Sequence, residues 1–217
     1  MNKLFSIFTF VRLSNRFNHL QQNEKITLKQ EFENSIANFQ EKIFLRTYFT
    51  SGLKEDCDIL FWRMHSSLDY LQNICARTFS IGIGKYMDVR YTYIGAKDFQ
   101  KSMDDINSSF GIYPYLLVHP LNKSHEWYDL SDEDRKKMMK ERENVLSKYT
   151  KIQENFFISY GIDDQDMIVV REASDINNLI SATENLKCLK NKCYTTNDRP
   201  VFLSIGKDLR EILDNIS

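Results

Sequence analysis

One histidine stands out among the residues whose types could support chemistry. His119 ends the apolar run that begins at Tyr115 and comes directly before Pro120. An imidazole at the end of a strand can act as an acid, a base or a metal ligand near neutral pH. A lone histidine is more often satisfied by packing, and both interpretations stay open from the residues alone. The other histidines have no motif around them: His19, His65 and His125.

Two further motifs suggest chemistry only weakly. Gly82-Ile-Gly84-Lys85 lacks the full Gly-x-x-x-x-Gly-Lys-Ser/Thr pattern of a phosphate loop, so we interpret it as a turn between a helix and a strand. Cys188 and Cys193 form the nearest cysteine pair, but a tetrahedral zinc site needs two more clustered ligands. No serine-histidine-aspartate or cysteine-histidine arrangement follows from the spacing.

The composition excludes several classes of protein. The 217 residues carry 29 Lys+Arg against 30 Asp+Glu, and without a basic run this balance disfavours a nucleic-acid partner. No apolar stretch approaches the roughly 18 residues of a transmembrane helix. The short apolar run after Lys3 lacks a small-residue cleavage site, and Arg12 and Arg16 follow it. Free thiols without an export signal predict a cytoplasmic protein that binds neither nucleic acid nor membrane.

A duplication organises the elements that would position these side chains. A glycine turn, an acidic loop and an apolar strand occur twice. Gly52 matches Gly161 at an offset of 161 − 52 = 109. Asp58 matches Asp166 at an offset of 166 − 58 = 108, so one of the two loops is a residue shorter. The two halves of the chain are therefore predicted to share one local structure.

The segments around the two turns predict strands and helices. Ser66 and Ser174 can cap the helices that follow them, and Thr27 with Gln30 has the spacing of a capping box. Apolar residues between 26 and 39 fall largely on one helical face. Besides the strand after Asp58, the predicted strands cover residues 4–13, 43–50, 87–94, 113–119, 152–159, 167–171 and 201–205. Further helices are predicted over residues 131–149 and 175–186 and at the C-terminus.

This order of elements predicts the fold class. Each half runs strand, helix, strand, strand, helix, strand, which is the pattern of a ferredoxin-like unit. Two such units can bury their sheets against each other with the helices outside. We predict an α+β fold in a single domain over residues 1–217, with repeat 1 at about 1–110 and repeat 2 at about 111–217.

Several blocks of the sequence carry a family resemblance. Residues 119–139, His-Pro-Leu-Asn-Lys-Ser-His-Glu-Trp-Tyr-Asp-Leu-Ser-Asp-Glu-Asp-Arg-Lys-Lys-Met-Met, are similar to a Tyr-Pro-x-x-Lys…Trp-Tyr-x-Leu-Pro-Glu-Glu-Glu-Arg-Arg block. Residues 45–53 resemble Arg-x-Tyr-x-Thr-x-Gly-Leu, and residues 159–164 resemble Ser-x-Gly-Leu-Asp-Asp. These patterns belong to the chlorite dismutase-like family, which includes coproheme decarboxylase and heme-dependent peroxidases. The resemblance covers nearly the whole chain.

The resemblance implies a fold, a cofactor and an assembly. It implies a dimeric α/β barrel made of two fused ferredoxin-like repeats, often a homopentamer, that holds heme or coproheme in its C-terminal half. It also implies a heme-dependent oxidoreductase of the peroxidase or decarboxylase type. Lys123 is likened to a lysine that contacts a porphyrin propionate, and Trp127 keeps its family type.

The sequence departs from the family at the residues nearest the iron. Arg142 stands where the resemblance places the proximal histidine, and a guanidinium has no lone pair to offer iron. Glu154 stands at the distal arginine or glutamine position, or Asn155 does if a nearby deletion shifts the alignment by one residue. A carboxylate has the wrong charge to stabilise an anionic peroxide. His119 replaces the reactive tyrosine of coproheme decarboxylase.

Two functional interpretations follow from these departures. The first is a heme oxidoreductase with altered ligation, in which His119 and Glu154 are catalytic and His119 binds the metal. Lys123, Trp127 and Arg142 would then contact the cofactor. The alternative is a heme-free barrel that binds another small molecule or acts as an oligomeric interaction module. Conventional chlorite dismutase activity is the least expected outcome, because the groups it uses on both sides of the iron are replaced.

Overall fold

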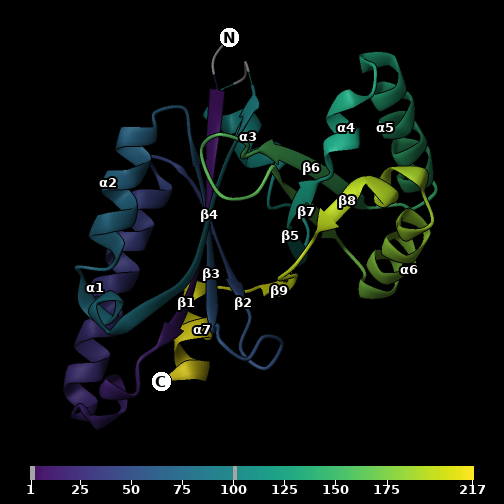
Figure 1. Ribbon diagram of the computed structural model, residues 1–217. Helices are drawn as coiled ribbons and strands as arrows, with labels where there is room; N and C mark the ends of the chain where they lie inside the picture. The colour runs from purple at the N-terminus through teal and green to yellow at the C-terminus, as the bar shows by residue number, and fades with distance from the viewer. Residues whose placement is uncertain (1–2, 100–101) are drawn as a thin grey trace.

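Two βαββαβ units follow one another in the computed structural model, which describes residues 3–99 and 102–217 (Figure 1). The first unit comprises β1 (Lys3–Leu13), α1 (Gln22–Gln40), β2 (Phe44–Phe49), β3 (Ile59–His65), α2 (Leu68–Thr78) and β4 (Met87–Asp98). The second comprises β5 (Tyr115–Lys123), α5 (Asp132–Leu146), β6 (Ile152–Ile158), β7 (Met167–Ala173), α6 (Ile176–Lys187) and β9 (Phe202–Gly206).

Shorter elements connect and extend the two units. They are the 3-10 turns η1 (Asn15–His19), η2 (Gly82–Tyr86) and η3 (Lys190–Tyr194), the helices α3 (Met103–Ser109), α4 (His125–Asp129) and α7 (Leu209–Ile216), and the strand β8 (Thr195–Asn197). The C-terminal helix α7 packs back on the first unit, where Ile212 and Leu213 are fully buried. No helix in the described part of the chain is long and apolar enough to cross a bilayer.

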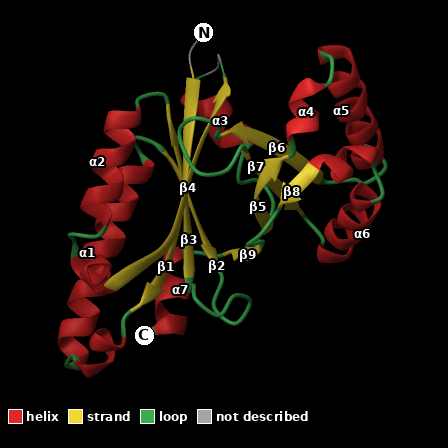
Figure 2. Ribbon diagram, in the orientation of Figure 1, coloured by secondary structure: helices red, strands yellow, loops and turns green. Residues whose placement is uncertain are grey.

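The strands of both units form one closed sheet. The strand order is β4-β1-β3-β2 in the first unit and β6-β7-β5-β9 in the second. The units join where Tyr48 of β2 pairs with Gly206 of β9 and where Ala96 of β4 pairs with Ile158 of β6. Helices α1 and α2 cover the outer face of the first unit, and α5 and α6 cover that of the second (Figure 2). The predicted α+β fold of two ferredoxin-like repeats in a dimeric α/β barrel is confirmed.

Aromatic side chains pack the inside of the closed sheet. Phe8 stacks on Trp62, whose indole Nε1 donates a 2.9 Å hydrogen bond to the Ser6 hydroxyl. Phe10 of the first unit stacks on Phe202 of the second, with ring centroids 3.9 Å apart. Burying each such ring contributes about 1.5–3 kcal/mol to stability. This packing holds the two units together. Because it fills the inside of the closed sheet, space for a ligand is expected on the outer faces, where the helices lie.

The duplicated turn has the same backbone conformation in both units. Gly52 has φ 77° and Gly161 has φ 81°, in the left-handed region that only glycine adopts without a steric penalty. The repeated order of elements is consistent with a division of the chain near residue 110, which stays a prediction.

The matched aspartates fix the turns to the sheet in the same way. The Asp58 carboxylate accepts a 2.8 Å hydrogen bond from the amide of Leu13, the last residue of β1. The Asp166 carboxylate accepts a 2.6 Å hydrogen bond from the amide of Lys123, the last residue of β5. The offsets found in the sequence therefore correspond to a repeated three-dimensional feature.

The predicted start of the first helix is wrong. Helix α1 begins at Gln22, so Thr27 and Gln30 lie inside it and form no capping box. The Thr27 hydroxyl donates instead to the Asn23 carbonyl at 3.0 Å, a bond within the helix. The polar residues of the first turn carry no apolar periodicity, which is why the sequence pattern placed the start too late.

Two helix caps lie one residue later than predicted. Ser67 caps α2 in place of Ser66, and Asp175 caps α6 in place of Ser174. Each true cap has extended backbone directly before the first helical residue, and its side chain accepts a hydrogen bond from an amide three residues ahead. Adjacent residues of equal capping ability cannot be distinguished by type alone.

Alanine substitutions test the duplicated turn. We expect Gly52→Ala and Gly161→Ala each to lower the free energy of unfolding by about 1 kcal/mol, because a Cβ disfavours positive φ. A Cβ added at either glycine would meet no atom within 4 Å, so packing should add no further penalty. Urea denaturation would measure both losses. A loss at one glycine and none at the other would contradict a shared turn conformation.

Candidate functional site

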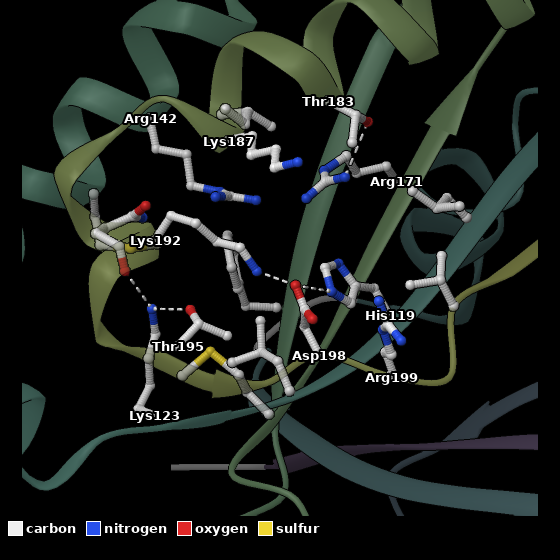
Figure 3. A pocket seen from close by; sticks show the side chains of 18 of the residues that line it. His119, Lys123, Arg142, Arg171, Thr183, Lys187, Lys192, Thr195, Asp198 and Arg199 are labelled. Carbon is white, nitrogen blue, oxygen red and sulfur yellow. Dashed lines mark hydrogen bonds and ion pairs between the residues drawn. The ribbon is translucent and has the colours of Figure 1, made fainter.

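A cavity of about 740 Å³ lies between the sheet of the second unit and its helices (Figure 3). Strands β5, β6 and β7 form one wall, and α5, α6 and η3 form the other. The segment between β8 and β9 supplies Asp198 and Arg199 at one side. A volume of this size is typical of sites for organic ligands.

The lining combines apolar surface with positive charge. Leucine, methionine and phenylalanine side chains supply much of the apolar surface: Leu117, Leu121, Met139, Phe156, Met167 and Leu186. The cationic groups come from both walls: Lys123, Arg142, Arg171, Lys187, Lys192 and Arg199. Among the described residues only Glu184 and Asp198 add carboxylates to the lining. Such a cavity attracts an anionic ligand that has a large apolar part.

A buried carboxylate connects the two walls. Glu154 of β6 accepts hydrogen bonds from Arg142 of α5, with Nε–Oε1 at 2.5 Å and Nη2–Oε2 at 2.6 Å. Arg171 of β7 donates to the same carboxylate, whose side chain is only 3% exposed. Burial alone would raise the pKa of Glu154, but the hydrogen bonds and charges of the two arginines outweigh it and hold that pKa below its usual value.

His119 faces this cavity as a neutral imidazole without a hydrogen bond to the protein. Both ring nitrogens are buried without a hydrogen bond, and the nearest carboxylate oxygen, on Asp198, is 3.6 Å from Nε2, too far for one. Burial, followed by the charge of Arg171, lowers the pKa of His119 to about 4. At pH 7 the ring therefore has a free lone pair, which can accept a hydrogen bond or a proton or bind a metal.

Lys123 and Trp127 form a corner of the cavity. The Lys123 amine donates to the Asn191 carbonyl at 3.0 Å and to the Thr195 hydroxyl at 3.2 Å, and it lies 4.5 Å from the centre of the Trp127 ring. Burial and the charge of Arg142 lower the pKa of Lys123 to about 8. The amine is thus already held by the wall through two hydrogen bonds and the indole face.

The structure brings the five predicted site residues together. Four of them line the cavity, and the fifth, Glu154, is bound to two arginines that line it. The alternative distal residue, Asn155, points to the inner side of the sheet, where its side chain accepts a 2.8 Å hydrogen bond from Lys97. Glu154 is therefore the residue of this pair that belongs to the site, while the roles proposed for all five stay predictions.

Several residues of the cavity were missed from the sequence. They are Arg171, Thr183, Lys187, Lys192, Asp198 and Arg199. The duplication contains a signal for one of them, because 171 − 63 = 108 places Arg63 at the position of Arg171. Arg63 donates to Thr78 at 3.3 Å, and Arg171 donates to Thr183 at 3.2 Å. Each arginine thus donates to a threonine of the helix that follows its strand, although the two threonines do not match at this offset, because 183 − 78 = 105.

The first unit lacks the carboxylate at the corresponding place. Leu45 pairs with Arg63 across β2 and β3, as Glu154 pairs with Arg171 across β6 and β7. Arg63 is fully buried beneath α2, with hydrogen bonds to threonines and no carboxylate partner among the described residues. The buried charge cluster is therefore specific to the second unit.

Comparisons with known proteins agree with this architecture. The sequence profile of the chlorite dismutase family matches residues 25–207. A coproheme decarboxylase of Mycolicibacterium smegmatis is 24% identical over 163 residues, 71% of this chain and 69% of that protein. A chlorite dismutase of Ideonella dechloratans is 23% identical over 203 residues, 84% of this chain and 69% of that protein.

A solved structure shares the fold over nearly the whole chain. The chlorite dismutase of Candidatus Nitrospira defluvii, solved in complex with imidazole, superposes with a TM-score of 0.87 at 19% identity. The match covers 98% of this chain and 94% of that one. At this level of identity the likeness establishes the arrangement of strands and helices.

The arginine–glutamate pair can be tested through stability. We expect Arg142→Met to lower the free energy of unfolding at pH 7 by about 3 kcal/mol, because it removes a partner of a buried carboxylate. The low pKa of Glu154 stabilises the fold above the usual glutamate pKa of about 4.3, and this contribution disappears as the pH falls through the folded-state value. Urea denaturation at pH 7 and pH 3 would measure the loss.

The matched control for this test lies on the same helix. Lys136→Met changes an exposed cation of α5 to the same side chain and should change stability by less than about 0.5 kcal/mol. Equal losses for the two variants, or an Arg142→Met loss that is unchanged at pH 3, would contradict a stabilising buried pair.

The buried His119 should make the free energy of unfolding depend on pH in a second range, at milder acidity. Its folded-state pKa of about 4 lies below the usual histidine value of about 6.5, so the unfolded chain binds the proton first as the pH falls. Between pH 7 and pH 5 this should reduce the free energy of unfolding by about 2 kcal/mol. In His119→Gln the free energy of unfolding should fall by about 2 kcal/mol less between these two pH values. An identical pH dependence in both proteins would show that His119 is not held neutral.

Proposed function

The chain belongs to the chlorite dismutase family, and on that premise we propose that the cavity of its second unit binds a porphyrin carboxylate of the heme or coproheme class. The observation that carries this proposal is the combination of apolar walls and lysine and arginine side chains in one cavity. Coproheme, named in the relatives' activity, has a broad apolar ring and carboxylate arms. The ring matches the apolar walls, and the carboxylates match the lysine and arginine side chains.

The cationic groups differ in their freedom to bind such carboxylates. Lys123 is held by two hydrogen bonds, and Lys192 is paired with Asp198. Within the described chain the side chains of Lys187 and Arg199 have no hydrogen-bond or ion-pair partner. Both residues line the cavity, and the Lys187 amine is directed toward its interior in Figure 3. We therefore assign the ligand carboxylates to Lys187 and Arg199, where charge-assisted hydrogen bonds would hold them.

An iron centre in the family's usual place does not fit the residues present. Arg142, at the proximal position, has no lone pair, and its guanidinium is already bound to Glu154. A histidine does face the cavity, but it comes from the sheet at position 119 rather than from α5. The peroxidase or decarboxylase activity expected from the resemblance stays a prediction. The lysine and arginine side chains of the cavity support binding of the porphyrin.

The assembly and the location of the protein also stay predictions. The family resemblance suggests a homo-oligomer, with five copies as the expected number, and the free cysteines suggest the cytoplasm. Size-exclusion chromatography with light scattering would give the number of copies directly.

A titration of the purified protein tests the proposal. Hemin and iron coproporphyrin should each give a saturable change of the Soret band near one equivalent per chain. Reversing one free charge, in Lys187→Glu or Arg199→Glu, should weaken binding about tenfold, because a charge-assisted hydrogen bond contributes about 1.5 kcal/mol.

The matched control is Lys85→Glu, which makes the same charge change on an exposed lysine of the first unit. It should bind as the unmodified protein does. A flat titration, or equal weakening by all three substitutions, would contradict a porphyrin site in this cavity.

A further inference from the structure

Resting on the proposed function, we infer that this cavity holds its porphyrin carboxylate without a bond to iron and that its ligand is the metal-free ring. The inference stands on the contact between Arg142 and Glu154, on the charges around His119 and on the cavity that exists beside the intact contact.

The two residues that would lie on opposite sides of a metal are joined directly. Arg142 comes from α5 and Glu154 from β6, and their side chains meet in two hydrogen bonds of 2.5 and 2.6 Å. Groups that face each other across a porphyrin cannot be in hydrogen-bond contact, because the ring lies between them. The place of the metal between these positions is therefore taken by an ion pair.

This ion pair resists opening. The Glu154 side chain is 3% exposed and the Arg142 side chain 11% exposed, so neither can turn to solvent within the fold. Separating them would leave a buried carboxylate with Arg171 as its remaining partner. An uncompensated buried charge is strongly unfavourable. A ring whose binding required the pair to open would therefore bind more weakly.

His119 is the remaining candidate to bind iron, and its surroundings disfavour a cation. Arg171, Lys192 and Arg142 all act on the ring with positive charge, and Asp198 alone opposes them. Burial is the main cause of the lowered pKa of His119, and these positive charges add to it; the same charges repel a metal cation at this place. A neutral ring centre has no such conflict with these charges.

The cavity does not require the ion pair to open. Its volume of about 740 Å³ is present with Arg142 bound to Glu154. The apolar walls and the free cations Lys187 and Arg199 all border this space. A ring placed there would lie beside the ion pair, with its carboxylates on the two free cations and no axial group required.

A comparison of two ligands tests the inference on the whole chain. Metal-free coproporphyrin, followed by its fluorescence, and iron coproporphyrin, followed by its Soret band, share the ring and the carboxylates and differ in the metal. The unmodified protein should bind the metal-free ring at least as tightly as the iron form, because no protein group bonds the iron and the charges around His119 disfavour a metal cation. Binding of the iron form at least tenfold more tightly, with the preference lost in His119→Ala, would overturn the inference and leave the porphyrin site standing. Binding of neither would overturn both.

A double substitution gives the converse test. Arg142→His with Glu154→Gln removes the ion pair and supplies a lone-pair donor on α5. This variant should prefer iron coproporphyrin over the metal-free ring by at least tenfold. Equal affinity for the two ligands would show that the ion pair is not what excludes the metal, and it would overturn the inference. Circular dichroism of the variant would confirm that it is folded before the comparison.

Discussion

The carboxylate of Glu154, buried between Arg142 and Arg171, determines how the second unit is built. A charge removed from water in this way must keep its partners, so the helix that carries Arg142 is fixed over the strand that carries Glu154. Both arginines are paired with this carboxylate, and both line the cavity. The cations that remain around the cavity, Lys187 and Arg199, are the ones available to a ligand.

The first unit shows what the same scaffold becomes without this cluster. Leu45 occupies the position of Glu154, and Phe32 and Ile36 of α1 fill the space above the sheet together with Phe61. In the second unit the corresponding helix α5 is rich in lysine and glutamate and buries only Met138 and Arg142. A helix with so little apolar surface cannot fill the gap over the sheet, and the result is a cavity. The site therefore arises from a core that is solid in one repeat and open in the other.

Much of the architecture could be predicted because it depends on local patterns: alternating strands, glycine turns and the repeated Asp58 and Asp166. The neighbourhood of the site also followed from a continuous block that contains His119, Lys123 and Trp127. The contact of Arg142 with Glu154 could not be predicted in this way. Each residue looks like a separate departure from the family, and only the packing of α5 on β6 shows that the two departures compensate each other. Lys187 and Arg199 were missed because they come from segments with no motif of their own.

A crystal structure of the protein with metal-free coproporphyrin bound is the most direct test of a porphyrin site beside an intact ion pair. The ring should lie against the sheet of the second unit, with its carboxylates at Lys187 and Arg199. Arg142 Nε and Glu154 Oε1, which are 2.5 Å apart, should remain joined by a hydrogen bond. A ring inserted between Arg142 and Glu154, with the two side chains separated, would contradict this assignment of the cavity.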